Sequence, residues 1–198
     1  MADSDALFEK LQDAEDRDQL ATARVLYEEI LAREPEEGSL LILYAANLIE
    51  LGDLATAEQI LARAEELSAE KTQPGLLTQF GNLARARGQF LVAEKYFREA
   101  HQLSPDDAEN LLNAAAMATG QGELSKAEYL LREAEKLRGE LHLDSLYHLA
   151  GNLVSQQRYQ DARSFFESIL ALDPGHELAK EWLEDLALRS ALSKQLCE

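Results

Sequence analysis

Cysteine and positive charge are both scarce in this chain. A single cysteine, Cys197, stands among 198 residues, so no internal disulfide can form, which agrees with a reducing compartment. We interpret this penultimate thiol as part of a frayed terminus rather than as a functional group. The 19 Lys and Arg are outnumbered by 37 Asp and Glu, which gives a formal net charge of -18. Because that excess repels phosphate backbones and anionic lipid surfaces, we expect neither nucleic acid nor membrane as a partner.

Long apolar runs are also missing. No stretch approaches the 18 residues that indicate a membrane-spanning helix, and the N-terminus has neither the basic start nor the apolar run of a secretory signal. We therefore expect a cytoplasmic protein. Hydrophobic residues make up 46% of the chain and charged residues 28%, proportions that favour a folded chain over a disordered one.

The sequence lacks the signatures of catalysis and of metal binding. It contains no His-Glu-x-x-His, Gly-x-Ser-x-Gly, P-loop or dinucleotide-binding pattern and no cysteine pair. The histidines are His101, His142, His148 and His176. None of them occurs in a sequence pattern that supplies the partner residues that catalysis needs. We interpret His142 and Asp144 as members of a solvated loop, and the acidic pairs do not follow the alternating ligands of an EF-hand. The sequence predicts no enzyme, no metal site and no cofactor.

What the chain does have is an internal repeat. Alanines recur at spacings of 34, 36, 34 and 35 residues, at Ala23, Ala57, Ala93, Ala127 and Ala162. A leucine stands sixteen residues before each of them, at Leu7, Leu41, Leu77, Leu111 and Leu146. A large apolar residue follows each by four, at Tyr27, Leu61, Phe97, Leu131 and Phe166. Because apolar residues recur at three and four positions within a unit, each unit is predicted to be a pair of helices.

Small residues and turn formers fit this interpretation. Gly81 and Ala93 have almost no side chain, so the two helices of the third unit can cross closely while Phe97 fills the gap beside them. Gly88 is predicted to form the turn between these helices. Prolines close three of the units, at Pro35, Pro105 and Pro174.

In these residues the sequence resembles the tetratricopeptide repeat family, whose unit of about 34 residues is a helix-turn-helix. The third unit matches best, at Leu77, Phe80, Gly81, Gly88, Phe90, Ala93, Phe97, Ala100 and Pro105. The first unit departs from the pattern at Lys10, and the fifth has Gln157 in place of the turn glycine. The resemblance covers about residues 5–174. It implies an all-α fold, an α-solenoid of five repeats that winds as a right-handed superhelix.

We place the repeat domain at residues 1–174, with repeats at about 4–37, 38–73, 74–107, 108–142 and 143–174. Slightly longer loops are expected at 69–73 and 139–142. Residues 175–198 are predicted to form a capping helix and tail. Its apolar stripe would cover the exposed edge of the fifth repeat, and consists of Leu178, Ala179, Trp182, Leu183 and Leu186. Alternatively, the face that contains Trp182 docks a second copy and makes a homodimer.

Members of the family generally hold a peptide against the concave wall formed by the first helices of their repeats. Helical geometry then assigns the inward-facing groove residues as Phe8, Gln12, Ile42, Leu43, Ala46, Gln79, Asn82, Leu112, Asn113, Ala116, Tyr147, His148 and Gly151. Asn82 and Asn113 match positions where relatives bind the backbone of an extended peptide, although such amides can equally be ordinary polar residues of a solvated wall. The larger apolar residues of this set suit hydrophobic anchors of a partner, unless packing between helices buries them.

The charge distribution of the chain indicates which charges its partner should have. Relatives that bind acidic chaperone tails use lysines and arginines, but Thr78, Asp144 and His148 occupy those positions here, which disfavours a carboxylate clamp. Residues 1–40 contain 12 Asp and Glu and 4 Lys and Arg, a balance of -8. We therefore expect a partner with basic residues beside an apolar segment, and salt-sensitive association.

The sequence thus favours a non-enzymatic adaptor or scaffold that binds a peptide or protein segment in the concave groove. One alternative is a secretion or assembly chaperone that holds an apolar segment of a client protein. Another is a structural subunit that self-associates through the C-terminal helix.

Overall fold

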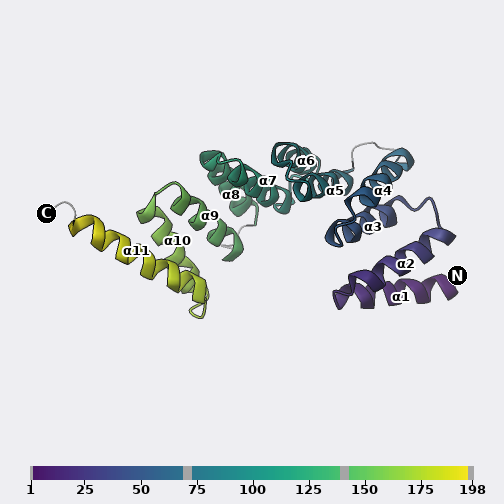
Figure 1. Ribbon diagram of the computed structural model, residues 1–198, viewed down its shortest axis with the longest axis horizontal. Helices are drawn as coiled ribbons and strands as arrows, with labels where there is room; N and C mark the ends of the chain where they lie inside the picture. The colour runs from purple at the N-terminus through teal and green to yellow at the C-terminus, as the bar shows by residue number, and fades with distance from the viewer. Residues whose placement is uncertain (1, 69–72, 139–142, 196–198) are drawn as a thin grey trace. The chain divides into compact units, whose positions relative to one another are not determined.

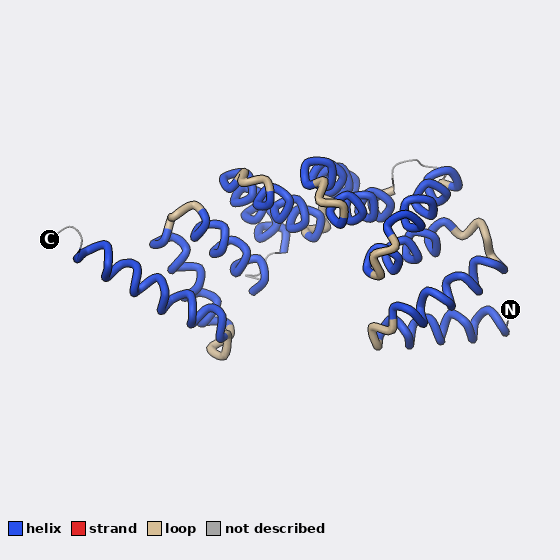
Figure 2. The backbone as a smooth tube through the Cα atoms, in the orientation of Figure 1, coloured by secondary structure: helices blue, strands red, loops and turns tan. Residues whose placement is uncertain are grey.

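The structure, a computed structural model, describes residues 2–68, 73–138 and 143–195. Within these ranges the chain consists of helices and connecting loops and contains no strand (Figure 2). The predicted all-α fold is confirmed. The longer loops expected around 69–73 and 139–142, together with His142 and Cys197, lie in or next to the segments outside the described residues.

The chain divides into two compact structural units, which we describe separately. The first, Met1–Ser104, contains three helix pairs (Figure 1). Their bounds are α1 Ala2–Asp16, α2 Leu20–Arg33, α3 Gly38–Glu50, α4 Leu54–Leu67, α5 Pro74–Ala86 and α6 Phe90–Leu103. The second, Pro105–Glu198, contains two pairs and a final helix. Their bounds are α7 Glu109–Gly120, α8 Leu124–Arg138, α9 Leu143–Ser155, α10 Tyr159–Leu172 and α11 Glu177–Gln195.

A left-handed residue ends the turn within each helix pair. Gly52, Gly88 and Gly122 have φ angles of +79°, +72° and +76°, which glycine adopts without steric cost. Asp18 and Gln157 occupy the same position in the first and last pairs, with φ angles of +54° and +61°. The turn geometry is therefore retained where the glycine is not.

The repeated alanines and the large residues after them form the core. All five alanines are buried, as are Tyr27, Leu61, Phe97, Leu131 and Phe166. A Cβ atom added to Gly81 would lie 2.7 Å from the Phe97 ring, so only glycine permits this crossing of α5 and α6. The sequence interpretation of Gly81 and Phe97 is confirmed.

Two buried asparagines join neighbouring repeats. Asn47 on α3 donates from Nδ2 to the carbonyl oxygen of Leu20 on α2, and Asn152 on α9 donates to that of Leu124 on α8, each over 3.1 Å. Both asparagines stand six residues after the repeated leucine. Each therefore satisfies a carbonyl of the preceding repeat from the same position in its own repeat.

Tyrosines connect α2 and α3 in the first structural unit. The rings of Tyr27 and Tyr44 stack with centroids 5.4 Å apart. The Tyr27 hydroxyl donates to Glu15, and the Tyr44 hydroxyl donates to Glu28 over 2.8 Å. Burial and these carboxylates raise the pKa of Tyr27 well above its usual range and that of Tyr44 to about 12.

The last helix, α11, packs on the preceding helix pair. Ala179 and Leu186 are buried, and the Trp182 ring stacks on Phe166 at a centroid distance of 5.9 Å. Leu178, which we assigned to the covering stripe, is instead 52% exposed, because it lies outside the face that meets α10. Trp182 therefore contacts the preceding helix pair, and the capping role of α11 stays a prediction.

Candidate functional site

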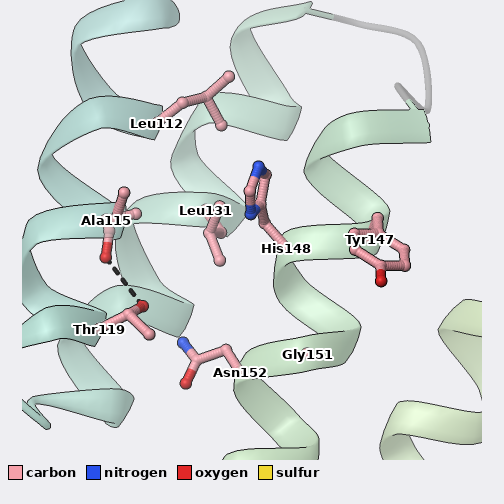
Figure 3. Close-up of a pocket in the computed structure, with 9 residues that line it drawn as sticks. Leu112, Ala115, Thr119, Leu131, Tyr147, His148, Gly151 and Asn152 are labelled. Atoms are coloured by element: carbon pink, nitrogen blue, oxygen red, sulfur yellow. Dashed lines mark hydrogen bonds between the residues drawn. The ribbon is translucent and has the colours of Figure 1, made fainter.

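A pocket of about 270 Å³ opens between the first helices of two consecutive repeats in the second structural unit. We call it the α7/α9 pocket. It is lined by Leu112, Ala115, Ala116, Thr119, Leu131, Tyr147, His148, Gly151 and Asn152. Figure 3 shows that His148 and Asn152 point from α9 toward α7. Leucine side chains and small residues give the pocket an apolar lining with a few polar groups at its edge.

Polar groups at one end of this pocket are already partnered. The Thr119 hydroxyl donates to the carbonyl oxygen of Ala115 over 3.0 Å, as Figure 3 shows. The Asn152 amide oxygen accepts from Gln156 Nε2 over 3.3 Å while its nitrogen donates to Leu124. With these groups satisfied, the remaining space suits an apolar guest.

Gly151 keeps the pocket open on the α9 side. A Cβ added there would meet no atom within 4 Å, so the missing side chain leaves real space rather than allowing a close helix crossing. The neighbouring Tyr147 is packed against Phe166 and His176, with ring centroids 6.1 and 5.7 Å away. It forms a fixed wall of the pocket.

The corresponding place in the first structural unit contains a second pocket, of about 190 Å³. We call it the α1/α3 pocket. It is lined by Glu15, Asp18, Leu20, Ala23, Tyr27, Leu43, Ala46, Asn47 and Glu50. Counted from the repeated leucine, Ala46 and Asn47 correspond to Gly151 and Asn152. The two pockets therefore occupy equivalent positions in the repeat pattern but differ in charge.

Seven of the residues assigned to the groove from sequence line these two pockets. Leu43 and Ala46 line the α1/α3 pocket, and the other five line the α7/α9 pocket, namely Leu112, Ala116, Tyr147, His148 and Gly151. The remaining six lie elsewhere on the first helices. Phe8 and Gln12 are exposed on α1. Ile42 is half-buried and packs against the core, next to Gly75 at the start of α5.

Besides Gln12, three amides of the predicted groove set lie outside both pockets, namely Gln79, Asn82 and Asn113. Asn82 donates from Nδ2 to Gln79 Oε1 over 3.1 Å, so the two side chains are paired on α5. Asn113 is half-buried on α7. The assignment of Asn82 and Asn113 to the backbone of a bound peptide stays a prediction.

Sequence reasoning did not single out Asn47 and Asn152. Both are buried and line a pocket. The available signal was an asparagine at the same position in the second and fifth repeats, where the third and fourth repeats have Leu83 and Met117 and the first has the exposed Asp13. A polar residue at an apolar position of a repeat indicates a buried hydrogen-bonding role.

In the part of the chain that the structure describes, no three His, Cys, Asp or Glu side chains gather closely enough to hold a metal ion. Likewise, none of its described helices has the length and apolar character needed to cross a membrane.

Comparison with known families identifies the repeat. Residues 14–72 match the family model described as tetratricopeptide repeat. This match confirms the predicted resemblance to the tetratricopeptide repeat family over those residues, and the helix pairs of the described residues have the fold that the resemblance implies. The comparison with curated proteins gave no match.

Solved structures share the fold at low sequence identity. PilW, a type IV pilus biogenesis factor, superposes with a TM-score of 0.81 at 17% identity, over 93% of this chain and 82% of PilW. MamA from Desulfovibrio magneticus RS-1 gives a TM-score of 0.71 at 17% identity, over 88% and 97%. YrrB, described as a tetratricopeptide protein with an unusual peptide-binding site, gives 0.65 at 15% identity, over 88% and 89%. At these identities the likeness shows the fold alone.

Proposed function

We propose that this chain is an adaptor that holds a peptide or protein segment of a partner against the first helices of its repeats. Tetratricopeptide arrays are typical protein-interaction scaffolds, and their stacked helices create extended binding surfaces. In this proposal each of the pairs α1/α2, α3/α4, α5/α6, α7/α8 and α9/α10 is one repeat, and α11 is the cap.

The observation that supports partner binding is the α7/α9 pocket. Its apolar lining from Leu112 and Leu131, with space left at Ala116 and Gly151, suits one apolar side chain such as that of leucine, methionine or phenylalanine. Burying such a side chain contributes about 1.5–3 kcal/mol. We propose that this pocket takes the apolar anchor of the partner segment. The YrrB comparison adds that a peptide-binding protein is known with this fold.

Peptides selected from a displayed random library against the purified chain test this function. Their affinities are then measured by fluorescence anisotropy with the wild type and with Gly151→Leu, which places a side chain in the open space of the pocket. We expect selected peptides to share an apolar residue and to bind the variant about 10-fold to 100-fold more weakly, since the anchor loses its site.

The matched control is Ala171→Leu, which adds the same side chain at an exposed position of α10 in the same structural unit. It should leave the affinity unchanged. Equal affinities for wild type and Gly151→Leu would contradict the anchor pocket. A library that yields no binding peptide would contradict the adaptor function.

A further inference from the structure

The α1/α3 pocket combines negative charge with an apolar wall. Glu15 at the end of α1, Asp18 in the following turn and Glu50 at the end of α3 contribute its carboxylates. Leu20, Ala23, Leu43 and Ala46 contribute the apolar part of the lining. The equivalent α7/α9 pocket has no acidic residue in its lining, where Thr119 and Leu131 replace Glu15 and Tyr27. Acidity therefore distinguishes this pocket from its repeat equivalent and is not a general property of the repeat.

A second observation, independent of the carboxylates, concerns the buried side chain of Asn47. It is 6% exposed and lines the pocket. Its nitrogen donates to Leu20, whereas its Oδ1 accepts no hydrogen bond from the described residues. At the equivalent Asn152, Gln156 supplies that hydrogen bond over 3.3 Å. The position equivalent to Gln156 is Leu51, which has no donor in its side chain. A buried acceptor without a hydrogen-bond partner lowers the stability of the folded state. A ligand that donates a hydrogen bond to Asn47 Oδ1 would remove that cost.

The carboxylate of Glu15 is held in place. One of its oxygens accepts from the Tyr27 hydroxyl, and Tyr27 is itself buried and stacked on Tyr44. The other oxygen retains its capacity to accept. Glu15 therefore offers a fixed acceptor on the same pocket as Asn47 Oδ1, and a guest need not order this side chain on binding.

These features suit a ligand group that carries a positive charge and several hydrogen-bond donors at the end of an apolar chain. A lysine side chain has three N–H donors on a compact ammonium group and a four-carbon chain that packs on apolar surface. A bare metal ion fits less well, because no metal-binding group of side chains occurs among the described residues. We infer that the α1/α3 pocket binds the ammonium group of a lysine on the partner segment, through Glu15, Glu50 and Asn47 Oδ1. This inference deepens the proposed function and rests on it for the segment that contains the lysine.

A small probe tests the pocket without the partner. Nα-acetyl-lysine amide is titrated into the isotope-labelled full chain at low salt, and backbone amide shifts are followed by NMR. We expect saturable shifts at Glu15, Asn47 and Glu50 and weaker binding as sodium chloride is added. The norleucine and Nε-acetyl-lysine analogues, which retain the stem but lack the charge, should give no saturable shifts there. Saturable binding of either analogue, or tighter binding of the arginine analogue, would overturn the lysine assignment.

Variants distinguish binding of the probe in this pocket from non-specific electrostatic attraction of the probe to an acidic protein. Glu15→Gln combined with Glu50→Gln removes two charges but keeps an acceptor for Tyr27, and should weaken binding about 10-fold or more. Glu65→Gln combined with Glu66→Gln removes the same charge from an exposed part of α4 and should leave the affinity within about 2-fold. Equal losses for the two pairs would overturn the inference.

Asn47→Leu is a third variant for this titration. Leucine is expected to be tolerated there because Leu83 occupies the same position in the next repeat. The variant should fold and also weaken binding of the probe about 3-fold or more. Retained binding would remove Asn47 from the site. Since this titration does not involve the α7/α9 pocket or any selected peptide, its failure is distinguishable from failure of the proposed function.

Discussion

At the scale of single residues, Gln157 adopts a backbone conformation that its side chain disfavours. Its φ angle is +61°, at the place where three other repeats have glycine. A left-handed residue other than glycine costs roughly 1–2 kcal/mol. Asp18 stands at the same place in the first repeat, but Asp tolerates this region better than Gln. The cost is therefore expected to be larger at Gln157.

Replacing this residue should stabilise the second structural unit. We expect Gln157→Gly to raise the free energy of unfolding by about 1 kcal/mol, because the relief of strain exceeds the added entropy of the unfolded chain. Urea denaturation followed by circular dichroism measures the change. Gln160→Gly, in the first turn of α10, is the control and should lower the stability, by less than the roughly 1 kcal/mol that glycine costs in a helix interior. A destabilising effect of Gln157→Gly would contradict the strain argument.

At the scale of helices, much of the fold was predictable from the sequence, because spacing of apolar residues determines which face of a helix is buried. The turn at Gly88 and the close approach of Gly81 to Phe97 follow from local pattern and residue size. Other side chains depend on neighbouring repeats. Ile42 packs toward α5, and Asn47 meets the carbonyl of Leu20. The residue pattern within one repeat does not determine contacts with the neighbouring repeat. The linings of the pockets therefore could not be predicted in detail from the sequence.

The packing of α2 against α3 predicts a loss of stability at high pH. Tyr27 and Tyr44 both have raised pKa values in the folded state, chiefly through burial and then through the carboxylates of Glu15 and Glu28. Their contribution is complete below the unfolded pKa of about 10 and is lost as the pH rises toward the folded values. We expect the free energy of unfolding of the wild type to fall between about pH 10 and pH 12.

Denaturation curves at pH 8, 10 and 11.5 measure this dependence. Tyr27→Phe combined with Tyr44→Phe should be less stable at pH 8, because two hydrogen bonds are lost, but should show a shallower decline above pH 10. Tyr129→Phe is the control, since Tyr129 is exposed on α8. A decline of the same steepness in the double variant would show that other groups cause it.

The stacking of Trp182 on Phe166 allows the cap and the dimer alternatives to be separated. If α11 covers the last repeat, Trp182→Ala should lower the stability of the second structural unit by about 1–3 kcal/mol and leave the molar mass unchanged. If this face joins two copies, the substitution should halve the mass. Light scattering and urea denaturation of the same preparations distinguish the two. Leu178→Ala is the matched control, because it shortens an apolar side chain at an exposed position of the same helix and should leave both quantities nearly unchanged.

At the scale of the whole molecule, the charge balance of -18 acts on every repeat. Most ion pairs that offset it are local and exposed. Arg17 and Asp13, for example, are 2.9 Å apart with more than half of each side chain exposed. Such pairs contribute about 0–1 kcal/mol each. The excess carboxylates repel one another over longer distances, and that repulsion opposes the folded state.

Screening should therefore stabilise this protein. The Debye length falls from about 30 Å at 0.01 M salt to about 10 Å at 0.1 M, which weakens repulsion between distant carboxylates more than attraction within a contact pair. We expect the melting temperature to rise by several degrees between 0.01 and 0.3 M sodium chloride. Replacing Glu36, Glu37, Glu65 and Glu66 by Gln should raise the low-salt melting temperature and reduce this dependence. A melting temperature that falls with salt would instead show that attraction within the ion pairs outweighs the net repulsion.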